Sequence, residues 1–357
     1  MFKTRMTELF GIQHPIMLAG MNWITEPGLV AAVCNAGGLG MLATARFAPD
    51  EARQNIREVR KLTDKPFGIN QALVLPGARE NVEIAIEEKV PIINYALGKP
   101  WFIDRVHAYG GKIMGTSATV RHAVRAEQLG CDAVIVTGNE AAGHGTAATS
   151  LVLIPIVASQ VKVPLIAAGG FYNGRGLAGA LALGADGISM GTRFSLTKES
   201  LVHDNFKQLC LKATEQDTLY SNAFDGMPGR VLKTKAAEKM MKSGIQFSEA
   251  FQGAGEIRKM LRLSYWQFIR LSLQMWRAEE GSPIWSQARQ AVGMRRHLRA
   301  INDGDVAEGI LFAGQGCGGI DDLPGVRELM DRIISEAETA CDSLQQKRQP
   351  PAVPPNR

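Results

Sequence analysis

Hydrophobic and polar positions along most of this 357-residue chain follow a two-part unit. Short runs rich in Ile, Val, Leu, Ala and Gly are each followed by an amphipathic stretch of helical length, which predicts alternating strands and helices. The strands are apolar throughout, as expected of parallel strands covered on both faces. The eight predicted strands are His14–Ala19, Leu39–Thr44, Phe67–Leu73, Pro91–Leu97, Lys112–Ala118, Ala133–Gly138, Pro164–Gly169 and Gly187–Gly191.

Eight such units predict an α/β fold, a closed (β/α)8 TIM barrel. A helix is expected after each strand, for example over Pro49–Thr63 and Thr119–Leu129, and the last over about His203–Gln216. An open doubly wound sheet is the alternative. That fold more often shows a GxGxxG motif after the first strand, whereas here the strand ends in Ala19-Gly20-Met21-Asn22.

The alternation stops between about Asp217 and Ala300. The segment has few strand signals and predicts a mostly helical inserted lobe, with helices over Ala254–Trp276 and Ile284–Leu298. We interpret its aromatic residues as core rather than ligand contacts. They are Tyr265, Trp266, Trp276 and Trp285.

The remainder, Gly309–Ala340, predicts a loop and a final amphipathic helix that packs back on the barrel. We therefore divide the chain into a barrel of residues 1–216 plus 301–345, a helical cap or dimer-forming lobe of residues 217–300, and a disordered tail of residues 346–357, which is rich in proline and polar residues.

The composition restricts the location and the partners that we expect for this protein. The net charge is +5, but residues 217–300 hold 14 Lys and Arg against 7 Asp and Glu, so this segment carries +7 and the rest about −2. Such a segment either is a solvated helical surface or attracts an anionic substrate or partner. The five scattered cysteines show no CxxC pair, and no signal peptide or membrane-spanning run is evident. We expect a cytoplasmic protein without a metal site, and neither a nucleic acid nor a membrane as partner.

Two glycine-bearing strand ends, Pro164–Phe171 and Gly187–Phe194, give the strongest chemical signal. Strands that end in bare backbone leave N–H groups free to bind an oxyanion. The first is followed by an expected helix start at Asn173-Gly174-Arg175-Gly176, whose N-terminus would add partial positive charge. Turn glycines are the alternative, but the position on strands 7 and 8 favours a phosphorylated cofactor.

The loop after strand 6, GNEAAGHGT over residues 138–146, is the next signal. In a barrel the active site lies at the carboxyl ends of the strands. His144 is the one histidine predicted at such an end, and an imidazole suits proton transfer at neutral pH. Glu140 is interpreted equally well as a carboxylate that binds loop N–H groups or as a catalytic group. No GxSxG or HExxH motif is present.

These motifs resemble the nitronate monooxygenase family, formerly called 2-nitropropane dioxygenases, over about residues 7–340. The resemblance rests on HPIMLAGM at 14–21, NAGGLG at 35–40, PFGIN at 66–70, NEAAGHG at 139–145, AAGGFYNGRG at 167–176, LALGADGISMGTRF at 181–194 and, more weakly, AGQG at 313–316. It implies an FMN-dependent barrel with a helical extension.

The resemblance also implies site residues. His144 would be the catalytic histidine facing the flavin and the substrate. Residues at strand ends would bind FMN: Gly20, Met21, Asn22, Asn70, Thr116, Gly143, Ala168, Gly169, Gly170, Gly191 and Thr192. Among them, the residues at the ends of strands 7 and 8, from Ala168 to Gly170 and at Gly191 and Thr192, would hold the phosphate. Thr116 stands where some relatives that accept hydride from a nicotinamide carry a lysine, and this weakens a nicotinamide-reductase interpretation.

The leading hypothesis is an FMN-dependent nitronate monooxygenase that oxidises an anionic alkyl nitronate with O2. The alternative is an NAD(P)H-dependent flavin reductase of the same family, acting on an enoyl thioester or a quinone. Its basic lobe would then bind an acidic carrier or a pyridine nucleotide. A third hypothesis is a flavin-binding protein without turnover, and a fourth is a barrel that binds a phosphorylated metabolite without flavin. A homodimer is a further expectation.

Overall fold

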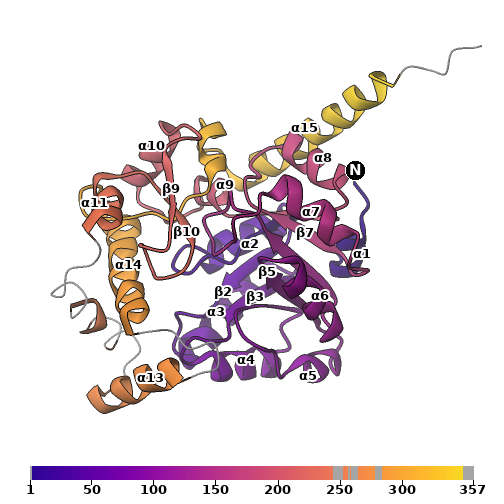
Figure 1. Ribbon diagram of the computed structural model, residues 1–357. Helices are drawn as coiled ribbons and strands as arrows, with labels where there is room; N and C mark the ends of the chain where they lie inside the picture. Colours follow the sequence, from indigo (N-terminus) through magenta and orange to yellow (C-terminus); the bar gives the residue numbers. More distant parts are fainter. Residues whose placement is uncertain (1, 244–251, 256–257, 259–263, 278–283, 349–357) are drawn as a thin grey trace, which may run out of the picture.

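In a computed structural model the first part of the chain folds into a barrel of eight parallel strands (Figure 1). The structure describes residues 2–243, 252–255, 258, 264–277 and 284–348. Each strand pairs in parallel with its neighbours in the order β1-β8-β7-β6-β5-β4-β3-β2. A parallel bridge between Met17 and Leu39 joins β1 to β2 and closes the barrel. The predicted fold class is therefore confirmed.

Every predicted strand is present and lies within its predicted range. The strands are β1 (Ile16–Leu18), β2 (Gly40–Ala43), β3 (Phe67–Ala72), β4 (Ile92–Ala96), β5 (Lys112–Ser117), β6 (Ala133–Thr137), β7 (Leu165–Ala168) and β8 (Gly187–Met190). Their residues are almost all buried, which explains the unbroken apolar runs in the sequence.

Helices follow the strands and cover the outside of the barrel (Figure 1). They are α2 (Pro27–Asn35), α3 (Pro49–Leu62), α4 (Ala78–Glu87), α5 (Ile103–His107), α6 (Val120–Gln128), α7 (Ser150–Ala158), α8 (Gly174–Ala182), the short α9 (Thr192–Ser195) and α10 (Asp204–Leu211). The helix α10 ends before the predicted Gln216 because Asp217 Oδ2 accepts hydrogen bonds from the N–H and the hydroxyl of Thr214, which form a turn.

Two apolar layers hold the barrel. The larger one lies between strands and helices, and the smaller one fills the barrel interior with Met41, Ile92, Met114 and their neighbours. An unpredicted helix α1 (Arg5–Phe10) adds Met6 and Phe10 to this inner layer. It thereby covers the end of the barrel opposite the strand carboxyl ends, which leaves the carboxyl ends as the open face.

The first difference between the lobe and the prediction is a pair of strands. The chain forms an antiparallel hairpin of β9 (Thr218–Ser221) and β10 (Gly229–Leu232), where the sequence shows few strand signals. Val231 also bridges to Phe312, so the hairpin is held against the returning chain. A strand of four residues is too short to be identified from the alternation of hydrophobic and polar residues. The pairing with other strands stabilises it.

The rest of the described lobe is helical, in α11 (Lys235–Ser243), α13 (Tyr265–Arg277) and α14 (Ile284–Asp303). The interpretation of the aromatic residues as core is wrong for two of them, since Tyr265 is 58% and Trp266 80% exposed on α13. The side chains of Trp276 and Trp285 lie outside the described part.

The returning chain forms a 3-10 helix η1 (Gln315–Gly319) and then the long helix α15 (Val326–Gln346). Val326, Leu329, Met330 and Ile333 of α15 belong to the larger apolar layer, so the prediction that this helix packs back on the barrel is confirmed. The helix α15 extends to Gln346, which is the first residue of the predicted tail. Residues 349–357 of that tail lie outside the described residues. The division into barrel, lobe and tail stays a prediction.

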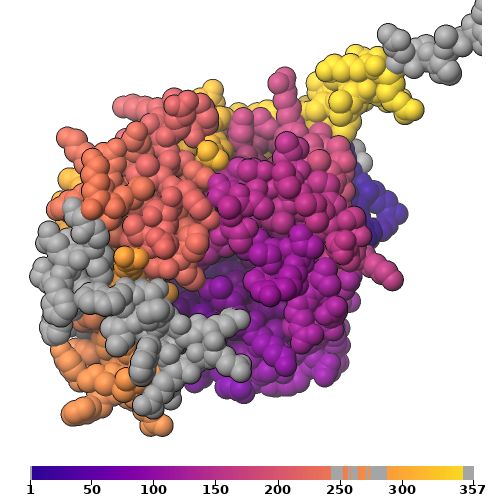
Figure 2. All heavy atoms as spheres, viewed as in Figure 1, coloured from indigo at the N-terminus to yellow at the C-terminus, as the bar shows by residue number. Residues whose placement is uncertain are grey.

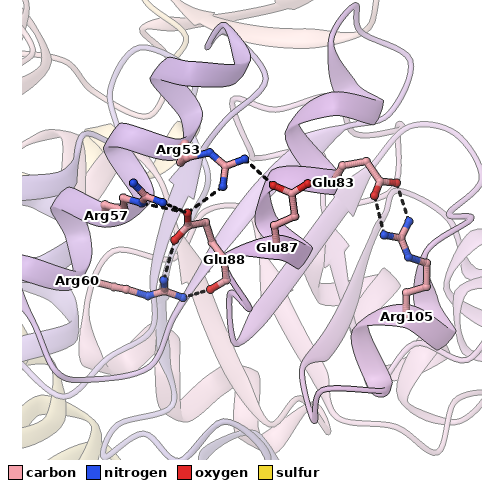
Figure 3. A network of polar contacts seen from close by, with 7 residues as sticks. All are labelled: Arg53, Arg57, Arg60, Glu83, Glu87, Glu88 and Arg105. Atoms are coloured by element: carbon pink, nitrogen blue, oxygen red, sulfur yellow. Dashed lines mark hydrogen bonds and ion pairs between the residues drawn. The ribbon is translucent and has the colours of Figure 1, made fainter.

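A network of ion pairs ties α3 to α4 and α4 to α5 (Figure 3). The carboxylate of Glu88, only 9% exposed, pairs with Arg53, Arg57 and Arg60. Burial alone would raise the pKa of Glu88, but the guanidinium groups of Arg57 and Arg53 bring it below its usual value.

No helix among the described residues combines the length and the apolar character that a membrane crossing requires.

Candidate active site

The predicted site residues stand out by their exposure. The strands are buried, yet the residues at their carboxyl ends keep part of their surface accessible. Those that are half-buried are Gly20, Met21, Asn22, Asn70, Thr116, His144, Ala168, Gly169, Gly170, Gly191 and Thr192, and Gly143 is exposed. The open face of the barrel therefore carries every predicted position. On the face seen in Figure 2 the surface is hollowed where the coral and orange lobe meets the purple barrel.

A chain of polar groups crosses four strands at this face. Thr116 donates to Asn94 Oδ1 at 3.1 Å, and Asn94 Nδ2 donates to Asn70 Oδ1 at 2.6 Å. Asn70 Nδ2 in turn faces Gly20 O at 3.4 Å. These bonds fix the Asn70 amide so that its NH2 group is directed to the first strand end. A Cβ at position 20 would lie 2.3 Å from Asn70 Cβ, so only glycine fits there.

The loop after β1 lies against the end of β8. A Cβ at Gly191 would lie 3.2 Å from Met21 Sδ, so Met21 covers this glycine. The buried Oδ1 of Asn22 has no hydrogen-bond partner. A buried acceptor without a donor is costly, and such an atom fits a ligand that brings an N–H group.

The backbone turns sharply after β7. Gly169 and Gly170 have φ values of +109° and +79°, a conformation that favours glycine. A Cβ at Gly169 would also lie 3.0 Å from Ser150 Oγ and 3.1 Å from Gly138 O. The hydroxyl of Ser150 faces the carbonyl oxygens of Ala168 at 3.3 Å and Gly169 at 3.0 Å. These contacts hold the turn in one conformation.

Two N–H groups at the start of α8 are bound by side-chain oxygens of the protein. Gly174 N donates to Glu336 Oε2 of α15 at 2.8 Å, and Gly176 N donates to Asn173 Oδ1. Protein oxygens therefore occupy this helix end. The other start, at Gly191 and Thr192, opens the short helix α9, whose first N–H groups have no partner within the helix. Thr192 Oγ1 accepts from Gly314 N at 2.9 Å, which brings the AGQG segment to the same strand end.

Glu140 in the strand-6 loop has a structural role in these contacts. Its carboxylate accepts hydrogen bonds from the N–H of Ser150 at 2.9 Å and from the Ser150 hydroxyl at 3.0 Å. A carboxylate is favourable at the first turn of a helix, here α7. This geometry favours the first of the two interpretations of Glu140.

His144 is held by the hairpin of the lobe. Its Nδ1 lies 3.3 Å from Pro228 O, and its Nε2 lies 3.2 Å from Asp225 Oδ2. The Asp225 side chain is 15% exposed and that of His144 is 32% exposed. Burial raises the pKa of Asp225, and the imidazole acts in the opposite direction. A contact between an imidazole and a carboxylate therefore stands at the end of strand 6.

A second histidine lies behind the first. Phe312 packs edge-on against both His144 and His297, at centroid distances of 6.4 and 5.5 Å. Full burial lowers the pKa of His297 to about 4, so this imidazole is neutral at physiological pH. It serves as a wall of the site and contacts Trp23 on its other side.

Three arginines of α14 have acidic or amide partners. Arg296 pairs with Glu308 at 3.0 Å, Arg299 pairs with Asp305, and Arg295 donates to Gln252. Lys259 and Arg262, which we counted in the basic lobe, lie outside the described residues. Within the described chain the five cysteines are free, and no group of three His, Cys, Asp or Glu side chains is placed to hold a metal ion.

Sequence reasoning missed three residues of this site. Asn94 was hidden in an apolar run, although its register opposite Asn70 follows from the aligned strands. Asp225 and Pro228 lie in the hairpin loop, where NAFDGMPG is a turn signal that predicts a hairpin. No signal in the sequence places that turn against His144.

With this geometry in view, comparison with known proteins identifies the class. The nitronate monooxygenase family model matches residues 3–84 and 76–336, and the chain belongs to this family of oxidoreductases.

Individual relatives differ in their names. The chain is 41% identical over 346 residues to (3aS,4S,5R,7aS)-5-hydroxy-7a-methyl-1-oxo-octahydro-1H-indene-4-carboxyl-CoA dehydrogenase of Mycobacterium tuberculosis, covering 94% of this chain and 96% of that protein. It is 31% identical over 285 residues to a probable nitronate monooxygenase of Staphylococcus saprophyticus, covering 66% and 80%. The structure of FabK from Thermotoga maritima matches with a TM-score of 0.80 at 34% identity, covering 98% and 100%.

Proposed function

We propose that this protein is an FMN-dependent dehydrogenase of a hydroxylated alicyclic carboxyl-CoA thioester. The observation that carries the proposal is the His144–Asp225 pair at the open face of the barrel. The 41% identity to a carboxyl-CoA dehydrogenase, over nearly the full length of both chains, supports the substrate class.

The residues present fit a flavin. Asn22 Oδ1 offers a buried acceptor without a donor, and the oriented NH2 of Asn70 offers a donor. Gly20, Met21, Thr116 and Gly143 would line the ring, while Ala168, Gly169, Gly170, Gly191 and Thr192 would hold the phosphate, with α9 rather than α8 supplying helix N–H groups. FMN supplies hydride acceptance when bound.

The protein's own side chains would then accept the proton that the substrate releases. Removing two hydrogen atoms from a carbon–hydrogen and an oxygen–hydrogen bond releases one hydride and one proton. His144 accepts the proton, because it is the titratable side chain at the strand-6 end with a carboxylate to stabilise its charged form. Phe312 and the neutral His297 exclude water on the side of the lobe.

Oxidation of an alkyl nitronate is the second candidate, favoured by the 31% identical relative of that name. A nitronate is already an anion and needs no proton acceptor. The carboxylate of Asp225 beside His144 is negative when ionised, so it gives an anion no attraction. The geometry therefore favours the dehydrogenase over our initial leading hypothesis.

The test compares substrates on the purified protein loaded with FMN, without air. A hydroxylated alicyclic carboxyl-CoA thioester should bleach the flavin absorbance, and the corresponding free acid should not. NADH and NADPH, added separately, test the reductase alternative by the same signal. No bleaching with any CoA thioester, together with rapid oxygen uptake on propyl-2-nitronate in air, would contradict the proposal.

The cytoplasmic location and the homodimer stay predictions. Gel filtration with light scattering at micromolar concentration checks the homodimer.

A further inference from the structure

The helix α13 presents apolar side chains to solvent at the outer edge of the lobe (Figure 1). Tyr265 and Trp266 are the most exposed of them, and Ile269 and Leu273 are 42% and 41% exposed. At 3.6 residues per turn these four side chains leave the helix within about 100° of one another. We call these four residues the α13 face. An apolar stripe of this width on a helix normally packs against a partner.

The start of α13 is determined by its own sequence. Ser264 N donates to Gln267 Oε1 at 2.8 Å, and Gln267 N donates back to Ser264 Oγ at 3.3 Å. This reciprocal pair is a capping box, which stabilises the first turn of a helix by local contacts alone. The helix, and with it the common face of the four residues, therefore follows from local sequence. Gln267 itself is exposed on the opposite side of the helix.

The charges before and after α13 have opposite signs. The sequence before the helix holds three cations and the sequence after it holds two acidic residues, with no acidic residue in between: Arg258, Lys259 and Arg262, then Glu279 and Glu280. Arg258 Cζ lies 4.9 Å from the centre of the Tyr265 ring, which ties one of these cations to the start of the α13 face. An antiparallel copy of the segment would bring its acidic end to this basic end, whereas a parallel copy would bring like charges together.

We propose that the α13 face binds the same face of a second copy of this chain, with the two helices antiparallel about a two-fold axis at Ile269. In this register Tyr265 packs against the partner's Leu273, and the basic end with Arg258 meets the acidic end of the partner. Because the interface is symmetric, each of these contacts occurs twice. Tyrosine, tryptophan and arginine are the residues most enriched at the centres of protein interfaces, and the α13 face supplies both aromatic types.

The charges of the segment favour a second copy over other occupants. An anionic membrane surface or an acidic protein would attract the arginines before α13 but repel Glu279 and Glu280 after it. A second copy is complementary to both ends at once.

Another exposed apolar surface, on α7, fits a copy of itself less well. Leu151, Val152 and Ile156 are 68%, 54% and 45% exposed there. Exposed arginines stand on the helices to either side, Arg121 on α6 and Arg175 on α8, and neither forms an ion pair within the described part of the chain. Two copies of this surface would bring these like charges together. The α7 surface therefore provides the control.

The α13 face belongs to the lobe that contacts His144. The helix α13 contacts α14, and α14 packs closely on the hairpin loop, since a side chain at Gly293 would collide with the carbonyl oxygen of Phe224. Pairing through α13 would thus join the two lobes of a dimer and leave the strand ends of both barrels open. The inference does not depend on the reaction proposed above.

The direct test is the molar mass of the purified full-length chain in analytical ultracentrifugation, from nanomolar to micromolar concentration. We expect a dimer for the wild type. Ile269→Lys should raise the dissociation constant about a hundredfold or more, because a charge enters the centre of the interface from both copies. Leu151→Lys, at an exposed leucine of α7, is the matched control and should dimerise like the wild type.

Two results of this experiment overturn the proposal. One is a wild type that stays monomeric at every concentration, including a monomer that cosediments with vesicles of anionic phospholipid. The other is a dimer that Ile269→Lys leaves intact, above all if Leu151→Lys dissociates it. Ile269 is exposed on one side, and far-UV circular dichroism shows whether the variant remains folded.

A cysteine variant tests the face and its orientation. Ile269→Cys should form a disulfide-linked dimer under mild oxidation, because the two-fold axis brings the two cysteines together. Gln267→Cys lies on the opposite side of the same helix and should stay uncrosslinked, as should the wild type. Equal crosslinking of Gln267→Cys and Ile269→Cys on a non-reducing gel overturns the proposed face.

A charge exchange tests the antiparallel register. Arg258→Glu should raise the dissociation constant by about tenfold, and adding Glu280→Arg to it should restore most of the affinity. A double variant that binds no better than Arg258→Glu overturns the register.

Discussion

At the scale of single residues, the proposed binding of the FMN phosphate depends on the turn at Gly169 and Gly170. Gly169→Ala puts a Cβ 3.0 Å from Ser150 Oγ at a φ of +109°. We expect a loss of about 1–3 kcal/mol in the free energy of unfolding and a protein that purifies without FMN. Gly179→Ala, at an open position on α8, is the control and should stabilise by about 0.5–1 kcal/mol. Urea denaturation and the flavin-to-protein absorbance ratio measure both; equal FMN content would refute this role.

Also at this scale, the sequence predicted the positions of the site residues better than their partners. His144, Asn70 and the glycines stand at strand ends, which the apolar runs define. Their partners come from far along the chain: Glu336 reaches Gly174 across 162 positions, and Pro228 reaches His144 across 84. Local pattern carries no information on such contacts, and this is why the bond from Gly174 N to Glu336 could not be predicted.

At the scale of elements, the β9–β10 hairpin holds the loop that carries His144. Arg230→Met removes its bonds to Asn139 while keeping much of the side-chain volume. We expect kcat/KM to fall by roughly tenfold to a hundredfold, since the loop that carries His144 loses its anchor. FMN binding should be retained, because the strand-7 and strand-8 ends are not altered. Unchanged kcat/KM in steady-state assays would show that the hairpin does not position the loop.

The ion-pair network between α3 and α4 makes a separate prediction on stability (Figure 3). Glu88→Gln leaves three guanidinium groups without their carboxylate and should cost roughly 1–2 kcal/mol, whereas Glu58→Gln, at an exposed pair with Lys61, should cost no more than about 0.5 kcal/mol. The pKa of folded Glu88 is lowered, so its contribution is present above the unfolded value and is lost as the pH falls through the folded value. Urea titrations at two pH values check whether the difference between wild type and Glu88→Gln shrinks in acid.

At the scale of the whole molecule, the barrel carries the predicted cofactor-binding positions and the lobe contacts His144. The barrel was predictable because eight apolar strands alternate with stretches of helical length, and closure follows from their number. The lobe was less predictable. Its strands of four residues depend on tertiary contacts, and Tyr265 and Trp266 are exposed because such contacts are absent around them. The proposed chemistry depends on the contact between the two parts, where Asp225 meets His144.

The measurement that tests the central claim most directly is anaerobic mixing of the FMN-loaded protein with a hydroxylated alicyclic carboxyl-CoA thioester, followed by visible absorbance. We expect stoichiometric bleaching in the wild type. In His144→Ala the rate should fall by about 10²–10⁴-fold, because the proton acceptor is removed. Bleaching at the same rate in His144→Ala, or none in a wild type that consumes oxygen with propyl-2-nitronate, would contradict the account.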